Sequence, residues 1–128
     1  MINLLIVDDE IELHFLFRAV YRNDGEVACQ FFSSGEECVE FLQGQSLDHK
    51  ATILLTDINM PGITGIDLLK IVSRDYPDIR TAVLSACDGD NIKKQASDHG
   101  AEQYFVKPID LKMIKKMIRS AFAVAKET

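Results

Sequence analysis

The sequence predicts an α/β fold, a doubly wound parallel sheet with helices on both faces, and two observations lead to it. Short segments rich in apolar and β-branched residues alternate along the chain with segments of helical periodicity. Polar residues directly follow four of the short segments, and open α/β sheets place their chemistry at the carboxyl ends of the strands. Since parallel crossovers are nearly always right-handed, we expect five βα units with the strands in the order 2-1-3-4-5.

The first strand is expected over residues 4–7, and a helix follows over about residues 11–21. Two stripes run along this helix: an apolar one of Leu13, Leu16, Phe17 and Val20, and a mixed one of Ile11, His14, Phe15 and Arg18. We expect the apolar stripe to face the sheet, which leaves Ile11 and Phe15 partly exposed beside the strand ends. Such a pair suggests a docking surface for a partner protein, and packing beneath a loop is the equal alternative.

The second strand is expected over residues 27–32. Ser34, with Glu37 three residues later, predicts a capping box that opens a helix to about residue 42. A polar loop over residues 44–52 then leads to the central strand, residues 53–56. This strand is continuously apolar or β-branched, as buried parallel strands are, and it ends directly before Asp57.

Apolar residues recur three, four and seven positions after Gly65, which predicts a third helix that ends before Pro77. The fourth strand is expected over residues 80–85. The helix after it, residues 91–99, has only Ile92 and Ala96 as apolar anchors, so we expect it to be the most mobile element. Gly100 ends that helix, and the fifth strand follows over residues 103–106.

The last helix is expected from residue 111 to about residue 125 and is strongly amphipathic. Its apolar face consists of Ile114, Met117, Ile118, Ala121, Phe122 and Ala125. Its basic face consists of Lys112, Lys115, Lys116 and Arg119. We interpret the basic face as a solvated surface rather than an anion site.

Length and composition limit the function classes. The 128 residues fit one domain, residues 1–128, and the net charge of −6 argues against direct nucleic-acid binding or an anionic membrane surface. The sequence has neither a membrane-length apolar run nor the pattern of a secretion signal, so a cytoplasmic location is expected. The three scattered cysteines are interpreted as reduced, packed thiols.

The polar residues at the strand ends predict phosphoryl chemistry when they are taken together. Asp8, Asp9 and Asp57 would converge, and crowded carboxylates call for a divalent cation, Mg²⁺ or Mn²⁺, because no Cys or His lies nearby. Lys107 and Ser85 can then bind oxygens of a phosphoryl group. Asp57 lies between the acid pair and these two residues, which makes it the expected nucleophile and predicts an aspartyl phosphate. Taken singly, the acids are also typical of helix caps and turns.

At these residues the sequence resembles the receiver (CheY-like) domain of two-component response regulators, which has a flavodoxin-like fold. The matching stretches are residues 6–10 (IVDDE), 55–65 (LTDINMPGITG), 83–86 (VLSA) and 105–108 (FVKP). The resemblance covers essentially the whole chain, and the four motifs together are highly specific. It implies signal transduction by transfer from a phosphohistidine to an aspartate, with no enzymatic activity beyond the domain's own phosphorylation and dephosphorylation.

The resemblance also implies roles for individual residues. Asp57 would accept phosphate from a sensor histidine kinase or a histidine phosphotransfer protein. Asp9, Asp57 and the main-chain carbonyl of Asn59 would bind Mg²⁺ directly, and Asp8 would act through water. Lys107 would bridge Asp57 and the phosphoryl group.

A further set of residues would couple the site to an output. Ser85 takes the place of the family's switch hydroxyl, and Tyr104 takes the place of the switch aromatic residue. The peptide bond between Lys107 and Pro108 is expected to be cis. The output face would consist of the 91–99 helix, the fifth strand and the last helix, and its downstream target is unknown. Residues 59 and 87 lie where the family varies its residues and tunes the lifetime of the phosphate.

Three other functions compete with this interpretation. A phosphatase of the haloacid dehalogenase type needs a second Asp two residues after the nucleophile, where this chain has Asn59. A flavin-binding protein of the same topology would have a hydroxyl- and glycine-rich loop at residues 8–10, where the chain has three acids. An interaction module without phosphorylation is disfavoured because the acids, the hydroxyl and the lysine are all present.

Overall fold

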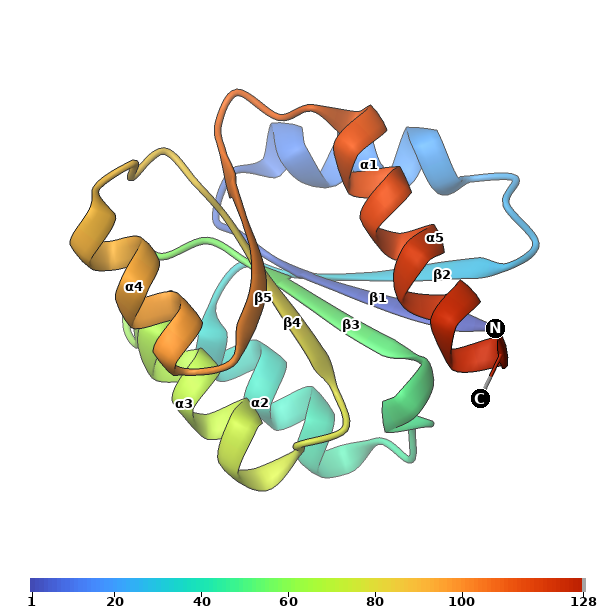
Figure 1. Cartoon of the computed structure of the whole chain (residues 1–128), viewed down its shortest axis with the longest axis horizontal. Helices are drawn as coiled ribbons and strands as arrows, with labels where there is room; N and C mark the ends of the chain where they lie inside the picture. The colour runs from blue at the N-terminus through green and yellow to red at the C-terminus, as the bar shows by residue number, and fades with distance from the viewer. Residues whose placement is uncertain (128) are drawn as a thin grey trace.

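The computed structural model describes residues 1–127, with side chains to Ser120, and Figure 1 shows its arrangement. Five strands alternate with five helices, as the sequence predicts. The strands are β1 (Ile2–Val7), β2 (Val27–Phe32), β3 (Thr52–Thr56), β4 (Arg80–Ser85) and β5 (Ala101–Val106). The helices are α1 (Ile11–Tyr21), α2 (Gly35–Gly44), α3 (Gly65–Asp75), α4 (Asp90–Asp98) and α5 (Leu111–Glu127), with a short 3₁₀ turn, η1 (His49–Ala51).

The strands form one parallel sheet in the order β2-β1-β3-β4-β5, which confirms the predicted α/β fold. Helices α1 and α5 cover one face, and α2, α3 and α4 cover the other (Figure 1). Strand β3 lies at the centre, and all five of its residues are buried between the two helical layers. Its carboxyl end is therefore flanked by the ends of β1 and β4, where the polar residues collect.

Helix α1 faces the sheet with most, but not all, of the predicted residues. Leu13 and Phe17 are buried as expected, but Leu16 is 37% exposed, so its assignment to the core is wrong. His14 and Tyr21 are buried in its place. The side of α1 that carries His14 packs toward β2, where the imidazole contacts the ring of Phe31 with 5.3 Å between the ring centroids.

Local signals account well for the other helices. Ser34 caps α2 by accepting a hydrogen bond from the Glu37 amide, but the Glu37 carboxylate accepts from the Ser33 amide rather than from Ser34, so the predicted capping box is only half formed. In α5, Ile114 and Ile118 are buried and the basic residues lie on the exposed side, as predicted. The predicted apolar contacts of Ala121, Phe122 and Ala125 lie outside the described side chains.

Three strands begin earlier than predicted. Strand β1 starts at residue 2, β3 at residue 52 and β5 at residue 101, where the predictions had residues 4, 53 and 103. The three cysteines carry no disulfide bond, and Cys38 is fully buried. Within residues 1–127, no helix is both long enough and apolar enough to cross a lipid bilayer.

Candidate functional site

The residues that end the strands are held in place by continued main-chain pairing. The amide of Asp57 donates to the carbonyl of Val7 at 2.9 Å, which extends the pairing of β3 with β1 by one residue. The amide of Lys107 donates to the carbonyl of Ser85 at 2.8 Å, which does the same for β5 and β4. The backbone positions of Asp57 and Lys107 are therefore set by the register of the sheet rather than by loops.

Three carboxylates meet at this edge. One oxygen each of Asp8, Asp9 and Asp57 lies within 4.8 Å of the others. Asp8 and Asp57 are buried and Asp9 is exposed. Burial raises the pKa of Asp8, and the negative charge of Asp57 adds to this rise, whereas the hydrogen bond from the Glu10 amide and the contact with the Lys107 ammonium group lower the pKa. The structure thus brings together the three acids that the sequence predicts.

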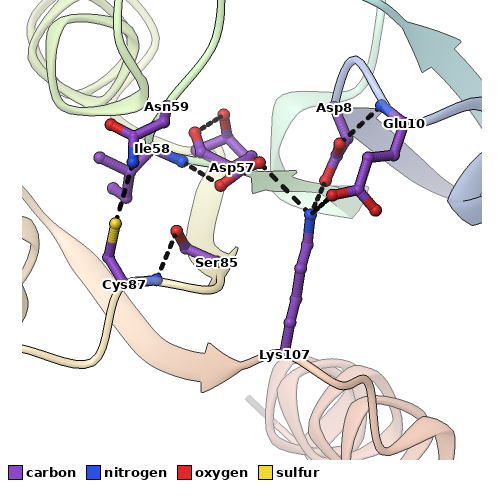
Figure 2. A network of polar contacts seen from close by, with 9 residues as sticks. Asp8, Glu10, Asp57, Ile58, Asn59, Ser85, Cys87 and Lys107 are labelled. Carbon is purple, nitrogen blue, oxygen red and sulfur yellow. Dashed lines mark hydrogen bonds and ion pairs between the residues drawn. The ribbon is translucent and has the colours of Figure 1, made fainter.

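Lys107 places its ammonium group among these acids. Its Nζ lies 2.9 Å from Asp8 Oδ2, 3.0 Å from Glu10 Oε1 and 3.3 Å from Asp57 Oδ2. Figure 2 shows the side chain extending from the end of β5 to this point. Burial lowers the pKa of Lys107, but the contacts with Asp8 and Glu10 and the charge of Asp57 outweigh burial, so the pKa lies above its usual value. The ammonium group is therefore charged at neutral pH.

The acid cluster fits a hard divalent cation. Asp8 Oδ2 is buried, and within the described chain it accepts no hydrogen bond, because the contact with Lys107 is an ion pair without aligned hydrogen-bond geometry. One ammonium group faces several carboxylates, so negative charge is in excess at this point. Carboxylate oxygens are the ligands that Mg²⁺ and Mn²⁺ prefer, and the cluster contains no sulfur or imidazole ligand.

The Asp57 carboxylate is fixed in orientation. Its Oδ1 accepts a hydrogen bond of 2.7 Å from the Ile58 amide, and its Oδ2 faces Lys107. Helix α3 begins directly against the same segment, because the Gly65 amide donates to the Ile58 carbonyl at 2.8 Å. A Cβ atom at Gly65 would overlap the Asp57 carbonyl oxygen, so this close approach depends on glycine.

The rim beside Asp57 is built from the loop after β4. The buried Ser85 accepts a hydrogen bond of 3.2 Å from the Cys87 amide through its Oγ. The Tyr104 hydroxyl donates to the Cys87 carbonyl at 2.6 Å, and burial raises the pKa of this phenol, which keeps it protonated. The side-chain amide nitrogen of Asn59 (Nδ2) lies 3.0 Å from the Cys87 sulfur (Figure 2). The two predicted switch residues therefore meet at one loop.

The exposed apolar residues of α1 lie on two flanks of the helix. Ile11 and Phe15 are exposed, as predicted, and the guanidinium of Arg18 lies 5.9 Å from the centroid of the Phe15 ring and 4.8 Å from that of Phe31. Leu16 lies on the other flank. It lines a groove of about 240 Å³ whose other walls include Glu10, Glu12, Lys107, Pro108 and Ile109.

Two contacts were not predicted from the sequence. Glu10 pairs with Lys107, and Cys87 contacts Asn59. The only signal for the first was a third acid directly after the Asp8-Asp9 pair. The predicted Lys107–Pro108 peptide bond is cis in the structure.

Comparison with known proteins gives a consistent result. Residues 4–119 match the family model described as the response regulator receiver domain. The chain is 31% identical over 120 residues to the heme response regulator HssR of Staphylococcus epidermidis, covering 94% of this chain and 51% of HssR. It is 28% identical to the response regulator GacA of Pseudomonas aeruginosa (96% and 56%) and 26% identical to the transcriptional regulator NtrC of Proteus hauseri (98% and 25%). The chain thus spans between a quarter and just over half of these relatives.

Solved structures agree on the fold. A CheY-like receiver domain protein from Methanospirillum hungatei matches with a TM-score of 0.85 at 18% identity, over 100% of this chain and 99% of that one. The response regulator TrrA of Thermotoga maritima, solved in complex with Mg²⁺ and BeF, matches with a TM-score of 0.78 at 23% identity, over 94% and 99%. At these identities the likeness concerns the fold alone.

Proposed function

The chain belongs to the response regulator receiver domain family, and from that premise we propose that Asp57 accepts the phosphoryl group. The observation that carries the proposal is the convergence of Asp8, Asp9, Asp57 and the Lys107 ammonium group at one edge of the sheet. Residues 1–128 would act as one receiver domain. Its phosphoryl donor would be a sensor histidine kinase or a histidine phosphotransfer protein.

In the proposed reaction an Asp57 carboxylate oxygen attacks the phosphorus atom of a phosphohistidine. A P–O bond forms as the P–N bond breaks, and the imidazole nitrogen keeps the electron pair of the broken bond. Lys107 pairs with a phosphoryl oxygen and Ser85 donates a hydrogen bond to another, which offsets the charge that builds there. Later attack of water on the aspartyl phosphate breaks the bond to Asp57 and releases inorganic phosphate and the free carboxylate. The only catalysis is then the domain's own phosphorylation and dephosphorylation.

The acid cluster would hold Mg²⁺, with Mn²⁺ as the alternative. The carboxylates of Asp9 and Asp57 and the main-chain carbonyl of Asn59 would bind the ion directly, and Asp8 would act through a water molecule. When bound, the ion supplies positive charge that neutralises the phosphoryl oxygens in an in-line transfer. The fixed orientation of Asp57 by the Ile58 amide presents one carboxylate oxygen for attack.

We expect phosphorylation of the wild-type protein by acetyl phosphate to depend on the metal. Chelation of divalent ions should reduce labelling by at least about a hundred-fold, because repulsion between the acids and the donor is then not neutralised. The measurement is the intact mass of the protein over time with Mg²⁺ or with EDTA. Readdition of Mg²⁺ should restore labelling, and undiminished labelling in EDTA would contradict the metal assignment.

The loop after β4 would couple phosphorylation of Asp57 to the output face. Ser85 and Tyr104 both bond to residue 87 in the structure, so a phosphoryl group that draws Ser85 toward Asp57 would alter the seating of Tyr104 and of α4. This is a local charge change that biases a movable element. The face formed by α4, β5 and α5 would then contact a downstream protein.

Exposed Phe15, with Ile11 on the same flank of α1, would dock the phosphoryl donor protein. Phe15→Ala should slow transfer from a histidine phosphotransfer domain by about five-fold or more, because exposed aromatic anchors carry much of the binding energy at such interfaces. Transfer from acetyl phosphate should be unchanged. The measurement compares both rates with those of Met113→Ala, which truncates a side chain of similar exposure on α5. If Phe15→Ala slowed phosphorylation by both donors equally, the proposed docking role of Phe15 would be contradicted.

A further inference from the structure

The ammonium group of Lys107 is surrounded by three carboxylates, all within 3.3 Å of Nζ. It donates hydrogen bonds to Glu10 and Asp57 and forms an ion pair with the buried Asp8. A phosphoryl oxygen that approaches this group must compete with these three carboxylates for its charge and its N–H donors. Which carboxylate leaves determines how readily the lysine reaches the phosphoryl group.

The three carboxylates differ in how firmly they are held. The Asp8 side chain is 1% exposed and accepts a hydrogen bond of 2.9 Å from the Glu10 amide. The Asp57 side chain is 9% exposed and is held by the Ile58 amide. The Glu10 side chain is 56% exposed, and within this cluster its carboxylate is held by the contact with Lys107. Exposed ion pairs of this kind contribute little and exchange readily.

The surroundings of Glu10 also provide space for its release. Its side chain borders the groove of about 240 Å³ that Leu16 and Pro108 line. The carboxylate can therefore turn away from Lys107 into a solvent-open groove without disturbing the core. Asp8 and Asp57 have no comparable freedom, because both are buried against the strand ends.

We propose that Glu10 is a positioning residue that holds Lys107 in the unphosphorylated protein and is exchanged for the phosphoryl group on Asp57. The inference rests on the proposed function. Glu10 then competes with the phosphoryl group for Lys107, and the strength of the Glu10–Lys107 pair sets the rate at which Asp57 is phosphorylated. A weaker pair should give faster loading even though the acid cluster and its metal ligands are unchanged.

Two variants of Glu10 and one control test this. Glu10→Gln removes the charge and keeps the shape, whereas Glu10→Asp keeps the charge and shortens the reach by one methylene. Glu12→Gln removes the same charge from an exposed neighbour that borders the same groove but does not pair with Lys107. Both Glu10 variants should raise the rate of phosphorylation by acetyl phosphate about two- to five-fold, the range an exposed ion pair supplies.

A second readout separates this effect from general electrostatics. By calorimetric titration, Glu10→Gln and Glu12→Gln should weaken Mg²⁺ binding by the same small factor, since each removes one nearby charge. A gain in rate for Glu10→Gln no larger than for Glu12→Gln would overturn the inference. So would a Glu10→Asp variant that behaves as the wild type does.

A third readout is independent of phosphorylation. In the metal-free protein, the ¹⁵N resonance of the Lys107 ammonium group should shift, and its hydrogens should exchange faster, in both Glu10 variants but not in Glu12→Gln. Unchanged resonances would overturn the inference even if Asp57 is phosphorylated normally. Shifted resonances in a protein that acetyl phosphate never labels would instead count against the proposed function, and with it against the exchange.

Discussion

Asp57→Asn is expected to abolish phosphorylation while leaving the fold intact. The amide cannot act as the attacking carboxylate, so labelling by acetyl phosphate with Mg²⁺ should fall by at least about a hundred-fold. The fold should persist because asparagine has the same shape and removes one of three repelling carboxylates, while Lys107 keeps Asp8 and Glu10 as partners. The measurements are intact mass for labelling and the thermal midpoint of unfolding for stability.

The matched control for this variant is Asp78→Asn. Asp78 is exposed in the turn before β4, at the edge of the sheet opposite the acid cluster, so the same chemical change there should leave labelling unaltered. Beryllofluoride with Mg²⁺ should raise the thermal midpoint of the wild type and of Asp78→Asn, but not of Asp57→Asn. Phosphorylation that survives unchanged in Asp57→Asn would refute Asp57 as the acceptor.

Gly65→Ala is expected to damage the fold and the site together. The added methyl group would overlap the Asp57 carbonyl oxygen and lie 2.8 Å from Ile58 Cα, and both are main-chain atoms that cannot turn aside. Overpacking of this kind costs about 1–3 kcal/mol in unfolding free energy, because either α3 or the Asp57 segment must shift. The shift should also weaken beryllofluoride binding, since the Ile58 amide that orients Asp57 lies in that segment.

Gly44→Ala provides the control for the glycine prediction. Gly44 ends α2, and a Cβ there would meet no atom within 4 Å. Alanine at an unhindered helical position is neutral or stabilising by up to about 1 kcal/mol. Urea unfolding of both variants measures the difference. Equal stabilities of Gly65→Ala and Gly44→Ala would show that α3 is not packed as closely on Asp57 as the structure has it.

Much of the fold could be predicted because local and long-range signals agree. The strand over residues 27–32, the helix over 11–21 and the strand over 80–85 have the predicted bounds, since each has a clear period and a clear breaker. On α1, Leu13 and Phe17 are buried as predicted and Val20 packs against the core, but the assignment of Leu16 was wrong because Leu16 fits a helical stripe as well as His14 does. Only the position of β2 beside the helix decides that His14 is buried, and periodicity carries no information about it.

The candidate site was predictable as a set of residues but not as a network. Strand ends and topology place Asp8, Asp57 and Lys107 at one edge of the sheet. The pairing of Glu10 with Lys107 spans 97 positions in the chain and depends on side-chain reach, which no local pattern encodes. The contact between Asn59 and Cys87 is of the same kind.

Main-chain pairing continues past the ends of the strands, so the strands that carry the clustered residues do not tolerate insertions. The loops at the opposite end of the sheet do. One residue inserted into β1, β3 or β5 would displace the following side chain by about 3.3 Å and turn it to the opposite face. Segments at the other edge of the sheet, such as residues 45–48 before η1, connect elements without carrying any of the clustered acids. Lengthening them costs little, since loop entropy grows only slowly with length. Inserted tags, labels or reporter domains therefore belong between Gln45 and Ser46, which are exposed, rather than at Leu47, which packs on the core, or at Asp48, which caps η1.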